Sequence, residues 1–376
     1  MDPSIAVHSI DLATLTPIVR KSVKNNKFII AEWSMDQLGG GAGNPVSVGL
    51  YRFKGMGKDQ EGRSIPWSVI LKIIQSPANV GWVNLGEGND QTHWNYWKRE
   101  PLIYQSGFLE TLPRGLSSPH CFGVVEHPGN VIWLWLEDIT ESDKEVWTLD
   151  HYARIAHLLG RFNGQYTLQS STPPFSWLGK QRIRSWLATT PWQAIPWEHP
   201  QMLTRYPKPE VNSFARMLVD HERFLTKMEG LPQTVCHGDT YPTNFMSRLL
   251  PDGQQEIVAL DWALAGIAPV GADLGQLVFG AQTNLKEVKQ TEIDTELYEN
   301  YLDGLKESGH QFERQFVRFG YTAYAALQVG LFQLYSLSES LKNAETVKKQ
   351  TIERPVILEC FEVTMANEAY NLLEEI

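Results

Sequence analysis

The chain changes character near residue 139, and this change limits the folds that it can adopt. Before it, short runs of β-branched and aromatic residues alternate with turn residues, which is typical of strands. A short amphipathic helix is expected over 11–25, and another helix near 100–110, where Pro101 is tolerated in the first turn. Strands are predicted at 27–33, 46–53, 65–74, 121–125 and 130–136. The first part of the chain therefore predicts a five-stranded sheet with few helices.

After residue 139 the apolar residues recur with a period close to 3.6, which predicts helices. The expected helices are 149–168, 211–228, 296–305, 312–341 and 351–373. At 376 residues the chain is long enough to bury two separate cores. The pattern predicts an α+β fold with a mixed lobe at 1–138 and a mostly helical lobe at 139–376.

The segment Val-Cys-His-Gly-Asp-Thr-Tyr-Pro-Thr-Asn-Phe-Met, residues 235–246, carries the strongest chemical signal. It places Asp239 five residues before Asn244, and a second acidic residue, Asp261, ends the apolar run Ile-Val-Ala-Leu. Phosphoryl transfer from ATP needs a carboxylate near the acceptor hydroxyl, and an amide oxygen and a second carboxylate to hold magnesium. This spacing supplies all three groups.

The continuation Asp-Trp-Ala-Leu-Ala-Gly-Ile-Ala-Pro-Val-Gly-Ala-Asp-Leu extends the motif. The chain here resembles the aminoglycoside phosphotransferase and choline kinase superfamily, a branch of the protein-kinase-like fold. Ala268 stands where that family usually has glycine. The resemblance covers about residues 27–340 and implies a small antiparallel β-sheet lobe with one helix that binds the nucleotide. It also implies a larger, mainly helical lobe with the catalytic loop and the acceptor site, and ATP and Mg²⁺ as cofactors.

By this resemblance, Asp239 orients or deprotonates the acceptor hydroxyl, and Asn244 and Asp261 bind Mg²⁺. His237 is expected to fix the backbone of the loop. Asp273 is expected to be either a helix N-cap or a brace for the loop. Each of these residues lies in or just after the motif.

Lys72 lies inside an apolar strand, where a buried ammonium is costly without anionic partners. The resemblance implies that Lys72 reaches the α- and β-phosphates while it is paired with Glu100. The alternative for Lys72 is an edge-strand lysine that points to solvent. The alternative for Glu100 is an exposed helix charge, with Glu110 as the competing partner.

Two further segments are expected to hold the nucleotide. The cluster Gly-Gly-Gly-Ala-Gly, with Gly40 and Gly41, is followed by Pro45 and a strand instead of a helix. This order argues against a dinucleotide fingerprint and favours a glycine loop over the ATP phosphates, with a plain hairpin turn as the alternative. The strand that ends at Glu137 resembles the family's hinge, and backbone groups up to Ile139 would bond the adenine.

The acceptor is expected to be a small hydroxylated molecule, such as an aminoglycoside, an amino sugar or an amino alcohol. Aromatic side chains can stack on sugar faces or enclose an ammonium, although each one can equally be core packing. Acidic residues of the last helix could meet substrate amines, but solvent exposure is the simpler expectation for them. The aromatic candidates are Tyr241, Trp262, Tyr321 and Tyr324, and the acidic ones are Glu353, Glu359 and Glu362.

Composition narrows the partners. The formal charge of −10, from 33 Lys+Arg against 43 Asp+Glu, disfavours nucleic acid and anionic membranes. Three distant cysteines and the absence of a signal-peptide pattern fit a reducing cytoplasm. The apolar stretch 316–337 is interrupted by Arg318, Gln328 and Gln333, so a buried helix is expected there and not a membrane span. The oligomeric state has no signal in the sequence.

Two alternative functions remain open at this point. A catalytically silent nucleotide-binding scaffold would be expected to lack one of Lys72, Asp239, Asn244 or Asp261, but all four are present. A protein kinase would carry arginine at the position of Gly238, and Asp-Phe-Gly where this chain has Asp-Trp-Ala. Both departures favour a small-molecule acceptor.

Overall fold

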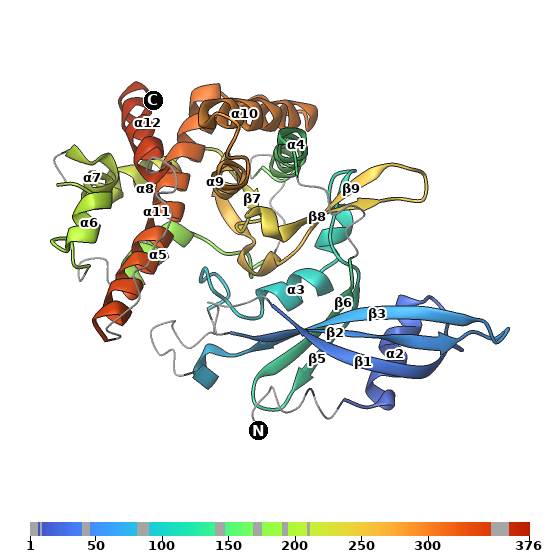
Figure 1. The fold of residues 1–376 in the computed structure, drawn as a ribbon. Helices are drawn as coiled ribbons and strands as arrows, with labels where there is room; N and C mark the ends of the chain where they lie inside the picture. The colour runs from blue at the N-terminus through green and yellow to red at the C-terminus, as the bar shows by residue number, and fades with distance from the viewer. Residues whose placement is uncertain are drawn as a thin grey trace. The chain divides into compact units, whose positions relative to one another are not determined.

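The computed structural model describes residues 7, 10–39, 46–80, 90–139, 147–167, 175–189, 195–208, 211–346 and 361–376. The chain divides into two compact units (Figure 1). The first comprises Met1–Gln91, Asn95–Lys144 and Met246–Ala263, and the second comprises Thr92–Trp94, Glu145–Phe245 and Leu264–Ile376. Gly40 and Gly41 of the predicted glycine loop lie outside the described residues.

The first unit is built on an antiparallel sheet with the strand order β1-β2-β3-β6-β5. All five strands predicted from the sequence are present. Val69, Leu71 and Ile73 of β3 are fully buried on the face that packs against α2 (Leu12–Ser22). Because side chains alternate along a strand, Lys72 points to the opposite face. The strands are β1 (Ile29–Leu38), β2 (Ser47–Lys58), β3 (Ser64–Gln75), β5 (Cys121–His127) and β6 (Val131–Glu137).

A smaller three-stranded sheet, with the order β4-β9-β8, completes this unit and was not predicted. Its first strand has only two residues and pairs in parallel with β9. One helix, α3, follows where a helix was expected, and two 3-10 turns flank it. The elements are β4 (Leu116–Ser117), β8 (Phe245–Leu249), β9 (Gln255–Ala259), α3 (Arg99–Gln105), η1 (Pro77–Val80) and η3 (Phe108–Thr111).

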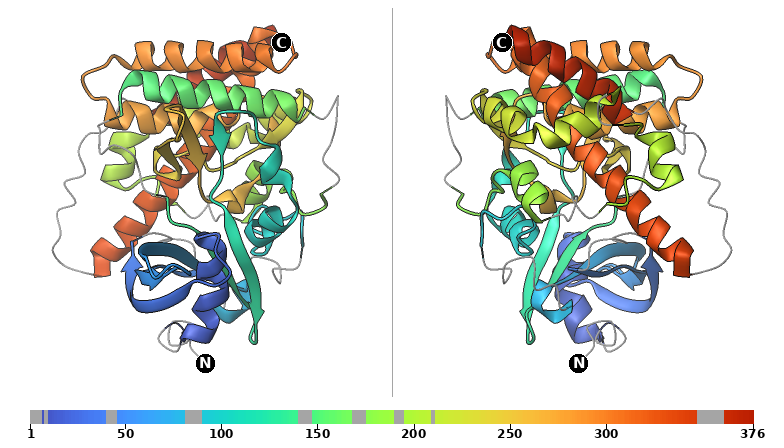
Figure 2. Two further views of the ribbon diagram at one scale, coloured as in Figure 1. Left: turned by 90° about the vertical axis from the view of Figure 1, so that its right-hand side faces the viewer. Right: turned by 90° about the vertical axis from the view of Figure 1, so that its left-hand side faces the viewer.

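The second unit is mainly helical. α4 and α10 pack side by side, and the long α11 packs against α12 and α9 (Figure 2). The predicted helix 211–228 is two helices, since the chain turns at Asp220, which ends α7 and precedes α8. The helices are α4 (Leu149–Gln165), α5 (Arg182–Thr189), α6 (Pro200–Arg205), α7 (Ser213–Val219), α8 (His221–Glu229), α9 (Leu274–Asn284), α10 (Gln290–Glu307), α11 (Arg314–Thr346) and α12 (Phe361–Glu375).

Short strands and turns interrupt these helices at the 235–246 motif, as expected from the sequence. β7 pairs with β10 in antiparallel register, and the loop between β7 and a 3-10 turn carries Asp239. Among the described residues, no helix is both long and apolar enough to span a bilayer. The elements are β7 (Gln233–Cys236), η6 (Pro242–Asn244), η7 (Trp262–Leu264) and β10 (Gly266–Pro269).

Candidate active site

Lys72 lies on a central strand of the first unit, between two carboxylates. Its neighbours across the sheet are Leu50 and Leu134. Its Nζ lies 2.6 Å from a carboxylate oxygen of Glu100 and 3.0 Å from Oδ1 of Asp261. The alternative of a solvent-facing edge lysine is therefore wrong, because the Lys72 side chain is only 13% exposed.

The electrostatics of this cluster follow from burial and from its three charges. Burial alone would lower the pKa of Lys72, but the charges of Asp261 and Glu100 outweigh it and raise that pKa above its ordinary value. Burial raises the pKa of Glu100 from 4.5 to about 7, although the Lys72 charge opposes this. Glu110, the competing partner, lies exposed on the 3-10 turn η3.

The helix α3 organises the cluster from one side. Glu100 in its first turn faces Lys72, and the neighbouring Arg99 is fully buried. The Arg99 guanidinium donates to the carbonyl of Ala263 at 3.0 Å, two residues after Asp261. Asp261 itself has a left-handed φ of 54°, a sparsely populated conformation that costs free energy for a non-glycine residue. Its side chain remains 39% exposed and therefore reachable by a ligand.

The segment at the end of β6 is fixed by ion pairs within the first unit. The Glu137 carboxylate accepts a hydrogen bond from Arg248 at 2.9 Å and another from the backbone N–H of His120 at 3.1 Å. Asp138 pairs with Arg52 at 2.8 Å, and Ile139 is buried. The side chains of the predicted hinge therefore position the backbone of the segment.

The catalytic loop of the second unit is held by Asp273. One Asp273 carboxylate oxygen accepts from the backbone N–H of His237 at 2.9 Å, and the other accepts from the N–H of Gly238 at 3.0 Å. Asp273 is also the residue before α9, but its side chain makes no capping bond there. Of the two expected roles for Asp273, the brace is confirmed.

Further contacts fix the residues on either side of Asp239. Buried His237 accepts the backbone N–H of Asp239 through Nδ1 at 3.2 Å, which agrees with a structural role. The Asn244 amide donates to the Asp239 carbonyl at 2.9 Å. The Thr240 N–H donates to the Gln276 side chain at 2.9 Å. The loop is thus anchored by its backbone, whereas the Asp239 carboxylate belongs to a partly exposed residue.

The Gly238 peptide has two donors on its carbonyl that the sequence did not reveal. Arg182 of α5 and Gln328 of α11 both donate to this oxygen, the latter at 3.2 Å. Gly238 has a φ of 80°, and a Cβ there would lie 2.3 Å from the carbonyl oxygen of Leu264, so glycine is required. Nothing in the local sequence points to either donor.

The aromatic candidates for acceptor contacts divide into two groups. Trp262 is fully buried and donates its indole N–H to the Ala259 carbonyl at 3.0 Å. Tyr321 is also fully buried, with its hydroxyl 2.7 Å from Asp294. These two are core residues. Tyr241 is partly exposed, and Tyr324 lines a small cavity behind the loop together with Arg182 and Gly238.

The expectation that the acidic residues of the last helix are solvent-exposed is wrong for Glu362. This carboxylate is fully buried and pairs with Arg205 at 2.7 Å and with the Tyr206 hydroxyl at 2.6 Å. Its charge is therefore satisfied inside the second unit and is not presented to solvent. Glu353 and Glu359 lie outside the described residues.

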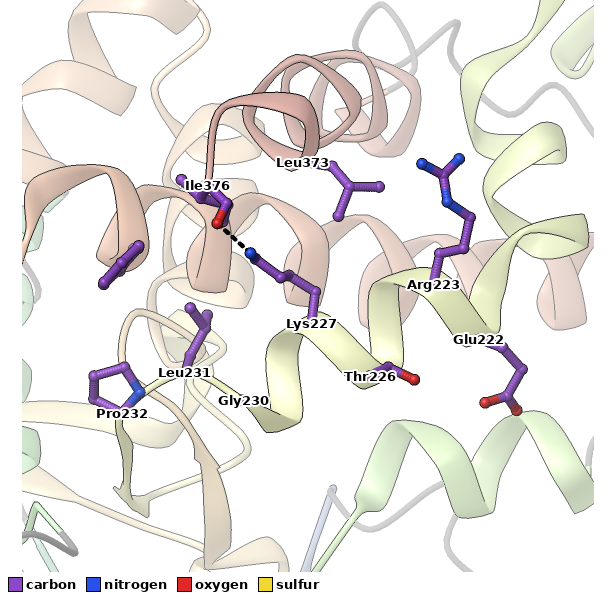
Figure 3. Close-up of a pocket in the computed structure, with 10 residues that line it drawn as sticks. Glu222, Arg223, Thr226, Lys227, Gly230, Leu231, Pro232, Leu373 and Ile376 are labelled. Carbon is purple, nitrogen blue, oxygen red and sulfur yellow. Dashed lines mark hydrogen bonds between the residues drawn. The ribbon is translucent and has the colours of Figure 1, made fainter.

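A large surface pocket of about 710 Å³ lies elsewhere in the second unit, between α8 and the end of α12 (Figure 3). Its lining includes Arg223, Lys227 and Leu373, and Lys227 donates to the carbonyl of Ile376. No residue of the catalytic loop lines it. Size alone therefore does not identify the site of chemistry in this chain.

The profile of the phosphotransferase enzyme family matches residues 119–319, more than half of the chain. The chain belongs to this family, and it is a small-molecule phosphotransferase with an alcohol group as acceptor. Its fold is the protein-kinase-like fold of the aminoglycoside phosphotransferase and choline kinase superfamily. A comparison with curated protein sequences gives no match.

Solved structures agree on the fold. An amicoumacin kinase in complex with AMP-PNP, Ca²⁺ and Ami is 14% identical, with a TM-score of 0.50 over 97% of this chain and 96% of that one. A choline kinase from Streptococcus pneumoniae is 14% identical, with a TM-score of 0.45 over 96% and 99%. A spectinomycin phosphotransferase in complex with ADP and its antibiotic is 11% identical, with a TM-score of 0.46 over 98% and 99%.

Proposed function

We propose that the chain transfers the γ-phosphoryl group of ATP to a hydroxyl of a small metabolite or antibiotic. The observation that carries the proposal is Lys72 between Glu100 and Asp261. A lysine on a central strand, paired with a helix carboxylate, is the arrangement that kinases use to hold the α- and β-phosphates. Because Glu100 fixes the ammonium, Lys72 can meet the nucleotide without first being ordered.

Asp239 is the proposed catalytic carboxylate. It lies on a loop whose backbone is anchored by Asp273 and His237, so its position is set before the acceptor arrives. In the reaction, the acceptor oxygen forms a bond to the γ-phosphorus, the bond to the bridging oxygen breaks, and ADP leaves. The hydroxyl proton passes to Asp239.

Asn244 and Asp261 are the proposed ligands of Mg²⁺, and their donor atoms fit this ion. The Asn244 amide nitrogen already donates to the Asp239 carbonyl, which leaves the hard amide oxygen for a cation. No group of three or more acidic, histidine or cysteine side chains in the described part of the chain could hold a metal alone. This suits Mg²⁺, which takes one or two carboxylates together with substrate phosphates. When bound, the ion would neutralise charge on the phosphates.

The remaining assignments concern the nucleotide and the two lobes. We propose that residues 1–138 form the nucleotide-binding lobe and 139–376 the acceptor lobe. The backbone from Glu137 to Ile139 would bond the adenine, and the loop with Gly40 and Gly41 would cover the phosphates. A cytoplasmic location, with free access to ATP, fits this role.

Three acceptor classes are compatible with the proposal: an aminoglycoside, an amino sugar and an amino alcohol. The amicoumacin kinase that shares the fold is only 14% identical, so its substrate does not select among them. The acceptor has to be found by experiment.

Thermal unfolding with ATP or GTP, each with and without Mg²⁺, tests the nucleotide site. A ligand that binds the native state raises the melting temperature, by about 2.7 kcal/mol of stability at a hundredfold excess over Kd. We expect a Mg²⁺-dependent rise for wild type and a loss of that dependence for Asp261→Asn. No rise with any nucleotide, or an unaltered Mg²⁺ response in Asp261→Asn, would contradict the proposal.

A further inference from the structure

One face of α11 extends outward from the catalytic loop. Tyr324, Gln328, Phe332 and Tyr335 are spaced four, four and three residues apart, so they share one side of the helix. Gln328 donates to the Gly238 carbonyl, which fixes this face at the catalytic loop. Further along, Phe332 and Tyr335 are 48% and 49% exposed. Two large aromatic side chains are therefore presented to solvent on the helix face that starts at the loop.

A second group of aromatic residues lies at the same carbonyl. Arg182, at the start of α5, also donates to the Gly238 oxygen. Its guanidinium lies 5.9 Å from the ring of Trp186, one turn later, and 6.0 Å from the ring of Trp94. The two indoles stack with centroids 6.0 Å apart, and both residues remain partly exposed. α5 packs against α11, so both aromatic groups belong to one region of the second unit.

These four residues define a surface that we call the aromatic platform: Trp94, Trp186, Phe332 and Tyr335. Partly exposed aromatic side chains that gather beside a catalytic loop are typical of ligand contacts, because flat apolar faces bind well to rings. Two of the four are held by stacking with Arg182, which limits the entropy lost when a ligand binds.

The charge beside the platform argues about the kind of ligand. Arg182 places a cation next to the catalytic loop. Burial and the Asp239 charge raise the pKa of Tyr241 to about 12, and the Arg182 charge opposes this, so Arg182 acts at the same place as Asp239. An acceptor with several ammonium groups would be repelled there. A neutral ring with hydroxyl groups at its edge meets no such cost.

We propose that the aromatic platform binds the acceptor, and that the acceptor is a neutral glycoside. Its sugar ring would stack on the aromatic faces and present one edge hydroxyl to Asp239. This inference rests on the proposed function and names the substrate class of that site.

The test measures ADP release from Mg²⁺-ATP with three sets of acceptors: neutral glycosides (methyl and 4-nitrophenyl glucosides and galactosides), kanamycin, and choline. We expect the glycosides to accelerate ADP release and kanamycin and choline to have no effect. Trp186→Ala and Phe332→Ala should each raise KM for the active glycoside about tenfold, since a lost ring contact is worth about 1 kcal/mol or more. kcat and the nucleotide-induced thermal shift should stay unchanged.

Val219→Ala is the matched control, because Val219 is 70% exposed on α7 and lies outside the platform. An unchanged KM in both aromatic variants would show that the platform is wrong. Acceleration by kanamycin or choline in place of glycosides would overturn the neutral-glycoside class. A nucleotide-induced thermal shift with no glycoside active up to its solubility limit would overturn this inference and leave the proposed function standing. Loss of the nucleotide shift itself would remove both.

Discussion

The ammonium of Lys72 lies 2.6 Å from the carboxylate of Glu100, and both side chains are largely removed from water. The pair joins the central strand β3 to the helix α3 within the first unit. A buried ion pair contributes little net stability, yet removal of one partner leaves the other charge without compensation. The pair is therefore both a structural bond and the proposed nucleotide contact, and the two roles can be separated by measurement.

Lys72→Met is expected to lower the free energy of unfolding by about 3–5 kcal/mol, because Glu100 is left buried without its cation. It should also weaken ATP binding. Urea denaturation and calorimetric titration measure the two effects.

Lys54→Met is the matched control for this variant. Lys54 lies on the neighbouring strand β2 and pairs with Asp36 at 2.6 Å, but the two side chains are 50% and 48% exposed. Its loss should cost at most about 1 kcal/mol and leave ATP binding intact. Equal losses of stability in the two variants would show that the Lys72 pair is not special.

The stability of the protein should carry a pH dependence that comes from Glu100. Its pKa is raised from 4.5 to about 7 in the native state, so the native state binds this proton more tightly than the unfolded chain. The resulting stability is complete below about pH 4.5 and is lost as the pH rises through about 7.

Glu100→Gln should remove this dependence. The difference in free energy of unfolding, wild type minus variant, should decrease between pH 4.5 and 7. Denaturation at a series of pH values measures it. Glu61→Gln serves as the control, since the Glu61 side chain is 65% exposed. A difference that is flat, or that increases with pH, would refute the direction given for Glu100.

Asp239→Ala is expected to lower kcat by about 10²–10⁴-fold, the usual contribution of a positioned acid or base. ATP affinity should change little, because Asp239 is proposed to act on the acceptor hydroxyl. Thr243→Ala, at an exposed position of the same loop, should leave both quantities unaltered. Normal turnover in Asp239→Ala would remove Asp239 from its proposed role.

Much of the fold was predictable, because each strand of the main sheet carries its own alternation of apolar residues. The three-stranded sheet was not, since β4 has two residues and pairs with β9, which is remote in sequence. The predicted helix 211–228 also failed, because apolar periodicity continues across Asp220 although the backbone turns there. Local patterns report local structure, and they do not report pairing over long separations.

The candidate site shows the same division. The spacing of Asp239, Asn244 and Asp261 is local and could be recognised directly. The donors to the Gly238 carbonyl could not, since Arg182 and Gln328 are separated from it by 56 and 90 residues. Only the folded chain brings these side chains to the loop.

Asp273→Asn is expected to reduce kcat more than it changes KM for ATP. The carboxylate accepts from the N–H groups of His237 and Gly238 and from the Asn163 amide at 3.0 Å. An amide has only one acceptor oxygen, so at least one buried N–H loses its partner, at a cost of about 1–3 kcal/mol. Asp252→Asn, in an exposed turn, is the control. Full activity in Asp273→Asn would show that the brace is dispensable for positioning Asp239.

Glu362 provides the last prediction, and it concerns stability alone. This carboxylate is fully buried on α12 and receives hydrogen bonds from Arg205 and Tyr206 of the α6 region. Glu362→Ala should cost about 3–5 kcal/mol, because the Arg205 cation loses its partner in a poorly solvated place. Glu374→Ala on the same helix is the matched control: Glu374 pairs with Arg223 at 3.1 Å but is 73% exposed, so its loss should cost at most about 1 kcal/mol. Thermal and urea unfolding compare the two variants, and equal stabilities would mean that burial of Glu362 does not strengthen the attachment of α12.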